Sequence, residues 1–228
     1  MLRSLVGSEM CIRDRLHPTT GTVTVNGVDI SASTEEAKKM RHKVGMVFQY
    51  PEHQLFEETI AEDIAFGPKN LGLSADEVDE RVREAMKFVG LDYDTYAERS
   101  PFHLSGGQMR RVAIAGVVAM NPDFLVLDEP SAGLDPFGRE EIFEEIIRLH
   151  KEKGITVILV SHNMEDISRM ASRLVVLDKG RIVLDGEPMD IFNNHRDALQ
   201  AVGVDVPPVS VTTVSYTHLR AHETPEQL

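Results

Sequence analysis

The 228-residue sequence contains one cysteine, Cys11, and no tryptophan. A single thiol cannot form an internal disulfide or a cysteine metal cluster, which favours a reducing compartment such as the cytosol. Aromatic residues make up only 6% of the chain, which argues against a platform that stacks single-stranded bases. Long apolar runs are also missing. The stretch around Ile158–Val160 is among the longest, and it falls far short of the ~18 residues that span a bilayer.

Basic residues are in the minority, with 24 Lys and Arg against 37 Asp and Glu and a net charge of -13. Duplex binding depends on clustered cations that meet phosphates, so this balance predicts no nucleic-acid partner. It does not exclude a nucleotide, because a nucleotide needs only a few local donors. The length and the hydrophobic content of 42% predict one globular domain, or one domain with a small subdomain.

Apolar runs rich in β-branched residues recur along the chain, and several of them lack polar alternation. Such runs predict strands that are buried on both faces of a parallel sheet. They are Thr22–Val25, Val44–Phe48, Phe124–Leu127, Thr156–Val160, Leu174–Leu177 and Ile182–Leu184. Lys179-Gly180 separates the last two and indicates a hairpin turn.

Helical patterns lie between these runs. Ser74 and Glu77 have the spacing of a capping box, and Gly90 stands where a C-terminal cap belongs. A second helix is predicted to begin at Asp135, with Pro136 in its first turn. Helices that alternate with buried strands predict an α/β fold with a mainly parallel sheet. The segment 71–120 has helices and no evident strand, so we expect an inserted helical subdomain there.

A pair of glycines, Gly106 and Gly107, opens the first turn of a predicted helix. Ser105 and Gln108 have capping-box spacing, and a well-capped helix is the simplest interpretation of those two residues. It does not explain the glycines, which are conformationally costly in a helix. Glycine lets a ligand approach the backbone N–H groups, and a helix N-terminus suits a phosphate.

Polar side chains follow three of the predicted strands. Asp128 and Glu129 come directly after Phe124–Leu127, where one carboxylate could hold Mg²⁺ and the next could polarise a water. His162 follows Thr156–Val160, and Gln49 follows Val44–Phe48. Parallel sheets bind ligands at the carboxyl ends of their strands, so these residues are candidates for one site. Separately, each could also be a cap or a surface group.

Together these elements resemble the nucleotide-binding domain of ABC ATPases, whose fold is related to the P-loop NTPases. Leu104–Gln108 reads LSGGQ, the family signature, and Phe124–Asp128 resembles the Walker B strand. Residues 131–135 resemble the D-loop. The resemblance covers residues 16–214, which we therefore expect to form a partial ABC ATPase domain.

Within that family, the sequence around Gln49 resembles the ATPases of energy-coupling-factor importers and of related cobalt and nickel importers. The residues that carry this resemblance are Phe48–Phe56, Ile64–Asn70 and Ser161–Asp166. It implies a subunit that hydrolyses ATP to energise the uptake of vitamins or transition-metal ions. The implied partners are a second ABC ATPase subunit, in a homodimer or a heterodimer, a transmembrane coupling subunit and a substrate-binding membrane subunit. The implied location is peripheral, at the cytoplasmic face of the cell membrane.

The resemblance also implies roles for the strand-end residues. Glu129 would be the general base on the attacking water, and His162 would stabilise the γ-phosphate of ATP. Asp128 would order the Mg²⁺ shell, while Gln49 would contact Mg²⁺ and link the site to the membrane subunit. Asp135 would communicate across the dimer.

The signature residues would act across the dimer as well. Ser105, Gly106, Gly107 and Gln108 would bind the ATP that is held by the opposite ATPase subunit.

One family element has no counterpart in these 228 residues. A P-loop, G-x-x-x-x-G-K-[ST], wraps phosphates in backbone N–H groups, yet no Gly-Lys dipeptide occurs anywhere. In the family, Walker A and the first strands would precede Leu16, and residues 1–15 match neither. Residues 1–15 and 215–228 instead resemble foreign or artefactual sequence. We therefore expect a chain that is truncated at the N-terminus and inactive alone.

Two alternatives remain open at this stage. One is a soluble ABC ATPase that acts on nucleic acid or ribosomes, against which the acidic charge argues. The other is a non-enzymatic fragment that offers its signature helix to a partner.

Overall fold

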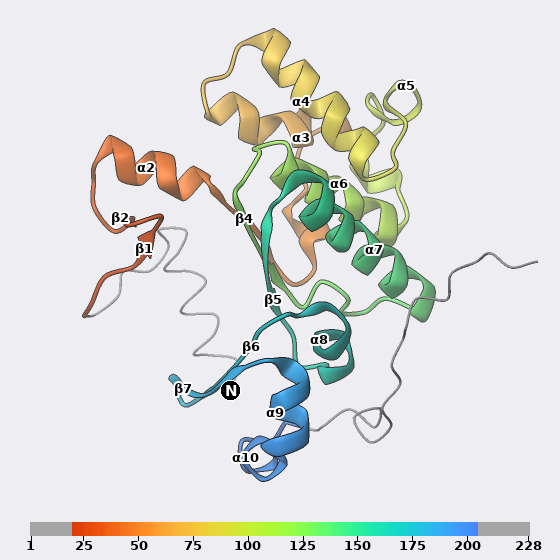
Figure 1. The fold of residues 1–228 in the computed structure, drawn as a ribbon. Helices are drawn as coiled ribbons and strands as arrows, with labels where there is room; N and C mark the ends of the chain where they lie inside the picture. The colour runs from red at the N-terminus through yellow and green to blue at the C-terminus, as the bar shows by residue number, and fades with distance from the viewer. Residues whose placement is uncertain (1–19, 205–228) are drawn as a thin grey trace, which may run out of the picture.

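The centre of the fold is a parallel sheet of three strands, in the order β3-β4-β5 (Figure 1). The computed structural model describes residues 20–204, so the predicted leader 1–15 and tail 215–228 lie outside the described residues. The strands are β3 (Val44–Val47), β4 (Phe124–Asp128) and β5 (Thr156–Val160). The register pairs Val47 with Leu127 and Asp128 with Val160. The carboxyl ends of all three strands therefore meet at one edge, as the sequence predicts.

Helices cover one face of this sheet (Figure 1). α6 (Gly106–Val118) packs on β3, and α7 (Pro136–Lys153) packs on β5. α3 (Ile60–Asn70) and α4 (Ala75–Phe88) pack on α6 and on each other. No strand is found between β3 and β4 in the described chain, and α5 (Tyr93–Tyr96) with two short 3-10 turns, η1 (Pro51–Gln54) and η2 (Pro101–His103), completes that segment.

The main hydrophobic core lies between the sheet and these helices. Leu125 and Leu127 of β4 join it and are fully buried. The intervening Val126 points to the opposite face, where it packs with Val44 and Met46. This alternation follows from the pleat of a strand, which directs successive side chains to opposite faces.

The prediction of strands buried on both faces is confirmed for β3 and β4 but is wrong for β5. Ile158 of β5 is 45% exposed, and Thr156 is exposed as well. In the described part of the chain, β5 pairs only with β4 and therefore forms an edge of the sheet. A continuous apolar run cannot reveal that a strand lies at an edge.

Two small antiparallel pairs flank the central sheet. β1 (Thr24–Val25) pairs with β2 (Val28–Asp29) beside α2 (Glu35–His42). β6 (Leu174–Asp178) pairs with β7 (Arg181–Gly186).

The β6–β7 pair packs in a second, smaller core with the C-terminal helices. These helices are α8 (Met164–Met170), α9 (Pro188–Asn194) and α10 (Arg196–Ala201). The predicted hairpin turn is confirmed, since Lys179 and Gly180 both have positive φ, 48° and 77°, as a type I′ turn requires.

The predicted helix ends are also found. Ser74 and Glu77 form a reciprocal capping box at the start of α4. The Asp135 carboxylate caps α7 by accepting the Gly138 N–H at 2.7 Å, and Gly154 ends that helix in the left-handed conformation. None of the helices in the described range combines the length and the apolar character that a membrane span requires.

Candidate functional site

Glu129 and His162 lie in direct contact at the carboxyl edge of the sheet. Glu129 Oε1 accepts the backbone N–H of His162 at 2.8 Å and lies 2.6 Å from His162 Nδ1. A carboxylate can only accept, so Nδ1 carries the proton and Nε2 is directed away from Glu129. The His162 side chain is 87% exposed, whereas that of Glu129 is 10% exposed. The buried carboxylate thus presents an orientated imidazole to the solvent.

The backbone holds Glu129 in an unusual conformation. Its φ is +47°, which costs an L-residue about 1 to 2 kcal/mol. Its N–H donates to Val160 O at 2.9 Å, and Ser161 Oγ donates to its Oε2 at 3.4 Å. Non-glycine residues persist in this region when their surroundings fix them, which occurs most often at functional sites.

Asp128 and Gln49 occupy the same edge without a direct contact to each other. Asp128 is half-buried, and its pKa is raised by desolvation and, to a smaller extent, by the charge of Glu129. Gln49 follows β3 and is also half-buried. No group of three or more His, Cys, Asp or Glu side chains in residues 20–204 could hold a metal ion. Mg²⁺ does not need such a cage, since it is usually held by one or two carboxylates, substrate phosphates and water. Burial disfavours the charged form of the Asp128 carboxylate. A bound cation would offset that cost, so Asp128 fits such a site.

The signature segment forms the exposed N-terminus of α6. Ser105 and Gln108 make a reciprocal capping box, with Gln108 N–H donating to Ser105 Oγ at 3.3 Å and Ser105 N–H donating to Gln108 Oε1 at 3.1 Å. The simple interpretation of those two residues as a cap is therefore confirmed. A Cβ added at Gly106 or Gly107 would meet no described atom within 4 Å. The packing of the described residues therefore does not require glycine at either position.

The D-loop residues follow Glu129 and are held by two buried charges, Arg110 and Asp166, that are not among the predicted site residues. Arg110 of α6 donates to the carbonyls of Pro130 at 2.7 Å and Ala132 at 3.1 Å. Asp166 of α8 accepts Ser131 Oγ at 3.2 Å. Arg110 and Asp166 are 3% and 1% exposed. Arg110 stands two residues after the signature, but no sequence pattern shows which carbonyls it meets.

The structure places the other predicted site residues as follows. Ser161, which is not among the predicted site residues, contacts Glu129. Asp135 is an exposed helix cap rather than a neighbour of Glu129. In residues 20–204, only Glu129 and His162 of the nine predicted site residues make a hydrogen bond across the strand ends.

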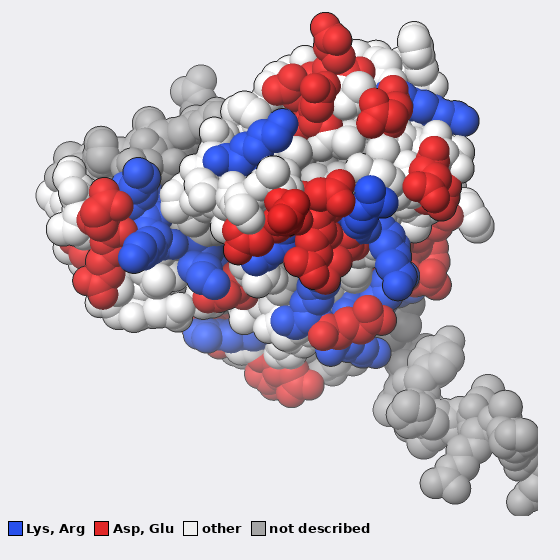
Figure 2. Space-filling model, turned by 90° about the horizontal axis from the view of Figure 1, so that it is seen from above, with Lys and Arg blue, Asp and Glu red and all other residues white. Residues whose placement is uncertain are grey.

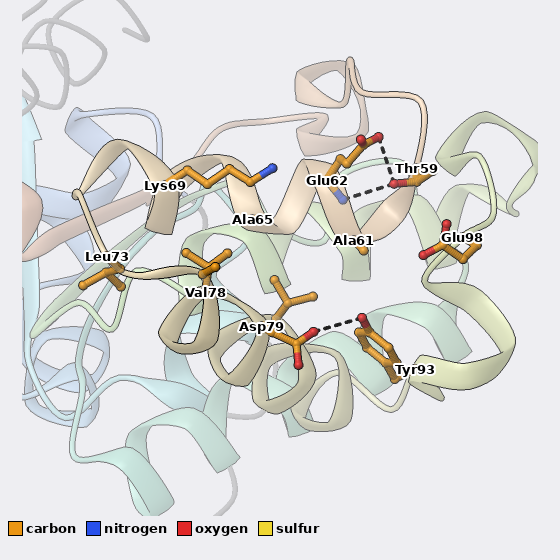
Figure 3. A pocket seen from close by; sticks show the side chains of 12 residues that line it. Thr59, Ala61, Glu62, Ala65, Lys69, Leu73, Val78, Asp79, Tyr93 and Glu98 are labelled. Atoms are coloured by element: carbon orange, nitrogen blue, oxygen red, sulfur yellow. Dashed lines mark hydrogen bonds between the residues drawn. The ribbon is translucent and has the colours of Figure 1, made fainter.

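A hollow of about 470 Å³ lies away from these residues, between α3 and α4 (Figure 3). Its wall includes Glu62, Lys69, Asp79, Tyr93 and Glu98. Tyr93 donates to Asp79 at 3.1 Å across its floor (Figure 3). None of the predicted site residues lines this hollow.

Charges of both signs are mixed on the face seen from above in Figure 2, where acidic side chains gather in groups with basic ones between them. That face offers no extended basic surface for nucleic-acid phosphates.

The family model described as ABC transporter matches residues 9–132. Energy-coupling factor transporter ATP-binding protein EcfA2 of Clostridium tetani is 56% identical over 199 residues, which cover 87% of this chain and 69% of that protein. The chain belongs to the ABC transporter family. The predicted α/β fold and the predicted resemblance to energy-coupling-factor ATPases are thereby confirmed.

Two solved ABC structures resemble the fold. CbiO1 from Clostridium perfringens, part of the ABC transporter complex cbiONQ, has a TM-score of 0.74 and 33% identity over 91% of this chain and 81% of that one. The ATP-binding cassette MJ0796, in a dimeric post-hydrolysis state with ADP and Pi, has a TM-score of 0.68 and 28% identity over 82% of each chain. Both similarities place the fold of this chain among ABC ATPase domains.

Proposed function

We propose that this chain is an ATP-binding and ATP-hydrolysing subunit that energises an energy-coupling-factor importer of vitamins or transition-metal ions. The observation that carries the proposal is the Glu129–His162 pair at the carboxyl end of β4, within an ABC fold. The similarity to EcfA2 of Clostridium tetani supports the type of importer.

Glu129 is the general base of the proposed reaction. Three hydrogen bonds from His162 and Ser161 fix its carboxylate, and a positioned base contributes about 10²- to 10⁴-fold to the rate. His162 stabilises the γ-phosphate. A protonated ring can keep Nδ1 on Glu129 while its exposed Nε2 donates to a phosphate oxygen. Most of the remaining rate enhancement comes from positioning and electrostatics.

Asp128 and Gln49 would hold Mg²⁺ at the strand ends. When bound, this ion neutralises the charge that develops on the phosphates. The half-buried Asp128 supplies the carboxylate, and the side-chain carbonyl of Gln49 supplies a neutral oxygen.

The signature helix acts on the ATP of a second ABC ATPase subunit. Ser105, Gly106, Gly107 and Gln108 present an exposed helix N-terminus with open space around both glycines. Phosphate binding at such a terminus uses free N–H groups and the positive end of the helix dipole. Asp135, at the start of α7, communicates between the two composite sites.

The segment after Gln49 is the proposed contact with the transmembrane coupling subunit. Phe56 is 58% and Phe66 46% exposed, and their rings stack edge to face with centroids 4.9 Å apart. Asp63 fixes this segment by accepting the Phe56 N–H at 3.1 Å. An exposed aromatic pair, formed here by Phe56 of the polar loop and Phe66 of the following helix α3, is a typical docking anchor. Such docking places the chain peripherally at the cytoplasmic face of the membrane, beside the coupling subunit and the substrate-binding subunit.

Hydrolysis by a chimera tests the proposed catalytic roles. Because the sequence has no P-loop motif, a family-like N-terminal segment with a Walker A loop is joined ahead of Leu16. We expect Mg²⁺-dependent ATP hydrolysis that Glu129→Gln reduces about 100-fold or more while ATP stays bound. The control is Glu144→Gln, at an exposed carboxylate of α7, which keeps full activity. Equal activity of the two variants would refute the role of Glu129.

A further inference from the structure

Arg110 joins three segments that are far apart in the sequence. Its backbone belongs to α6, two residues after the signature. Its guanidinium donates to the carbonyl of Pro130, just before the D-loop, and to the carbonyl of Ala132 within it. The same group lies 3.5 Å from Glu52 Oε2 in η1, three residues after Gln49.

The burial of this cluster makes its geometry costly to disturb. Arg110 is 3% exposed and the Glu52 side chain 18% exposed. Two carbonyl oxygens do not neutralise a guanidinium, so Glu52 supplies the counter-charge. Removing one partner from a buried charge pair is strongly destabilising, because the remaining charge stays desolvated.

The cluster is also incompletely bonded in the described chain. Arg110 Nε and Glu52 Oε2 are both buried, and neither makes a hydrogen bond there. A buried polar atom without a partner carries a free-energy cost. A small displacement of η1 against α6 would let Glu52 form a hydrogen bond with Arg110. Because the guanidinium is planar and rigid, the same displacement would shift Pro130 and Ala132, which it also contacts.

We infer that Arg110 is a positioning residue that couples the segment after Gln49, through Glu52, to the D-loop. In the proposed function, that segment docks on the membrane subunit, and the D-loop lies at the dimer contact. Arg110 thus connects docking to the geometry of the ATP sites. The functional meaning rests on the proposed function, whereas the coupling itself can be measured without ATP or partners.

Hydrogen exchange on the 228-residue chain tests the coupling. The N–H groups of Ala132 and Leu134 report on the D-loop, because they donate to Glu129 O at 3.0 Å and to Ser131 O at 3.2 Å. We expect Glu52→Gln to speed exchange at these amides about fivefold, since the Arg110 guanidinium loses its counter-charge. In an Arg110→Met background, the same Glu52→Gln change should have no further effect on them.

Two controls separate coupling from a general loss of stability. Glu58→Gln removes an exposed carboxylate of the same segment and should leave the D-loop amides unchanged. Arg111→Lys alters the next residue of α6, which pairs with Glu141 at 2.8 Å on α7, and it should leave them unchanged too.

Should Arg110→Met fail to fold, Arg110→Lys takes its place in the cycle. A single ammonium cannot reproduce the fork to both carbonyls and Glu52, so the effect of Glu52→Gln on the D-loop should fall at least twofold. The inference would be overturned if Glu52→Gln speeds exchange only in residues 50–56. It would also be overturned if Glu52→Gln speeds exchange of the D-loop amides equally in the parent and in the Arg110 variants. Because no ATPase assay enters, such a failure would leave the proposed function untouched.

Discussion

Glu145 lies at the contact between α7 and α6 and predicts an unusual response of stability to pH. The residue is 7% exposed, and its Oε1 lies 3.4 Å from Arg111 Nε, while its Oε2 makes no hydrogen bond in the described chain. Burial raises the pKa of Glu145 from 4.5 to about 7, although Arg111 and Arg148 act in the opposite direction. The nearby Glu141 raises the pKa slightly further.

The sign of the effect follows from proton binding. Between pH 4.5 and about 7, the folded chain binds more protons at Glu145 than the unfolded chain, so the free energy of unfolding falls as the pH rises. Each pKa unit corresponds to about 1.4 kcal/mol, which sets an upper limit of about 3.5 kcal/mol for the shift from 4.5 to about 7. Since solvent screens part of this charge, we expect about 1 to 2 kcal/mol.

Glu145→Gln removes the titration and keeps the shape of the protonated acid. Urea unfolding of both proteins at pH 5.5 and pH 8.5 measures the effect. We expect the variant to be more stable than the parent at both pH values, and its advantage to be about 1 to 2 kcal/mol larger at pH 8.5 than at pH 5.5, because part of the loss already occurs between pH 4.5 and pH 5.5. Asp63, Asp128 and Asp166 also have raised pKa values, so only the difference between the two proteins isolates Glu145. A variant that is less stable at pH 8.5, or a difference that is the same at both pH values, would refute the reasoning.

Three further outcomes are expected from the structure and sequence. The 228-residue chain should not bind Mg-ATP with micromolar affinity in titration calorimetry, because the sequence has no P-loop to supply most of the phosphate donors; micromolar binding would contradict this. In the P-loop chimera assembled with membrane subunits, Phe56→Glu should abolish transport and keep nucleotide binding. The control Ile182→Glu, at a site that is 63% exposed, should leave both intact. Transport by the Phe56→Glu variant would refute the proposed docking contact. In urea unfolding, Leu125→Ala, at a fully buried site, should lower the free energy of unfolding by about 3 kcal/mol. Ile158→Ala, at a site that is 45% exposed, should lower it by less than about 1 kcal/mol. Equal losses would show that β5 is covered in solution.

The sequence was sufficient for those features that depend on local signals or on strand order. The capping boxes of α4 and α6 follow from residue spacing, because each cap satisfies backbone groups of its own helix. The meeting of Glu129 and His162 follows from the parallel register, which pairs Asp128 with Val160. Both residues therefore leave the sheet at the same edge.

Other features depend on contacts that no local pattern contains. Sequence reasoning gave no reason to place Glu129 at a positive φ, because glutamate avoids that region and only its surroundings hold it there. The ion pair between Arg110 and Glu52 forms where η1 packs on α6. The sequence does not identify this pair, because many other Arg and Glu residues could pair equally well. The exposure of Ile158 depends on which strands lie beside β5, whereas its apolar run is typical of a buried strand.

Mixing two inactive variants tests the central claim that this chain builds composite ATP sites with Glu129 on one side and the signature helix on the other. In the P-loop chimera, Glu129→Gln disables the base, and Ser105→Arg blocks the exposed N-terminus of α6. Each variant alone should hydrolyse ATP at about 1% of the parent rate or less. In the mixed dimer, one site carries both changes and the other carries neither, so a substantial part of the activity should return. The account would be contradicted if heterodimers form and bind ATP at the unaltered site but do not hydrolyse it.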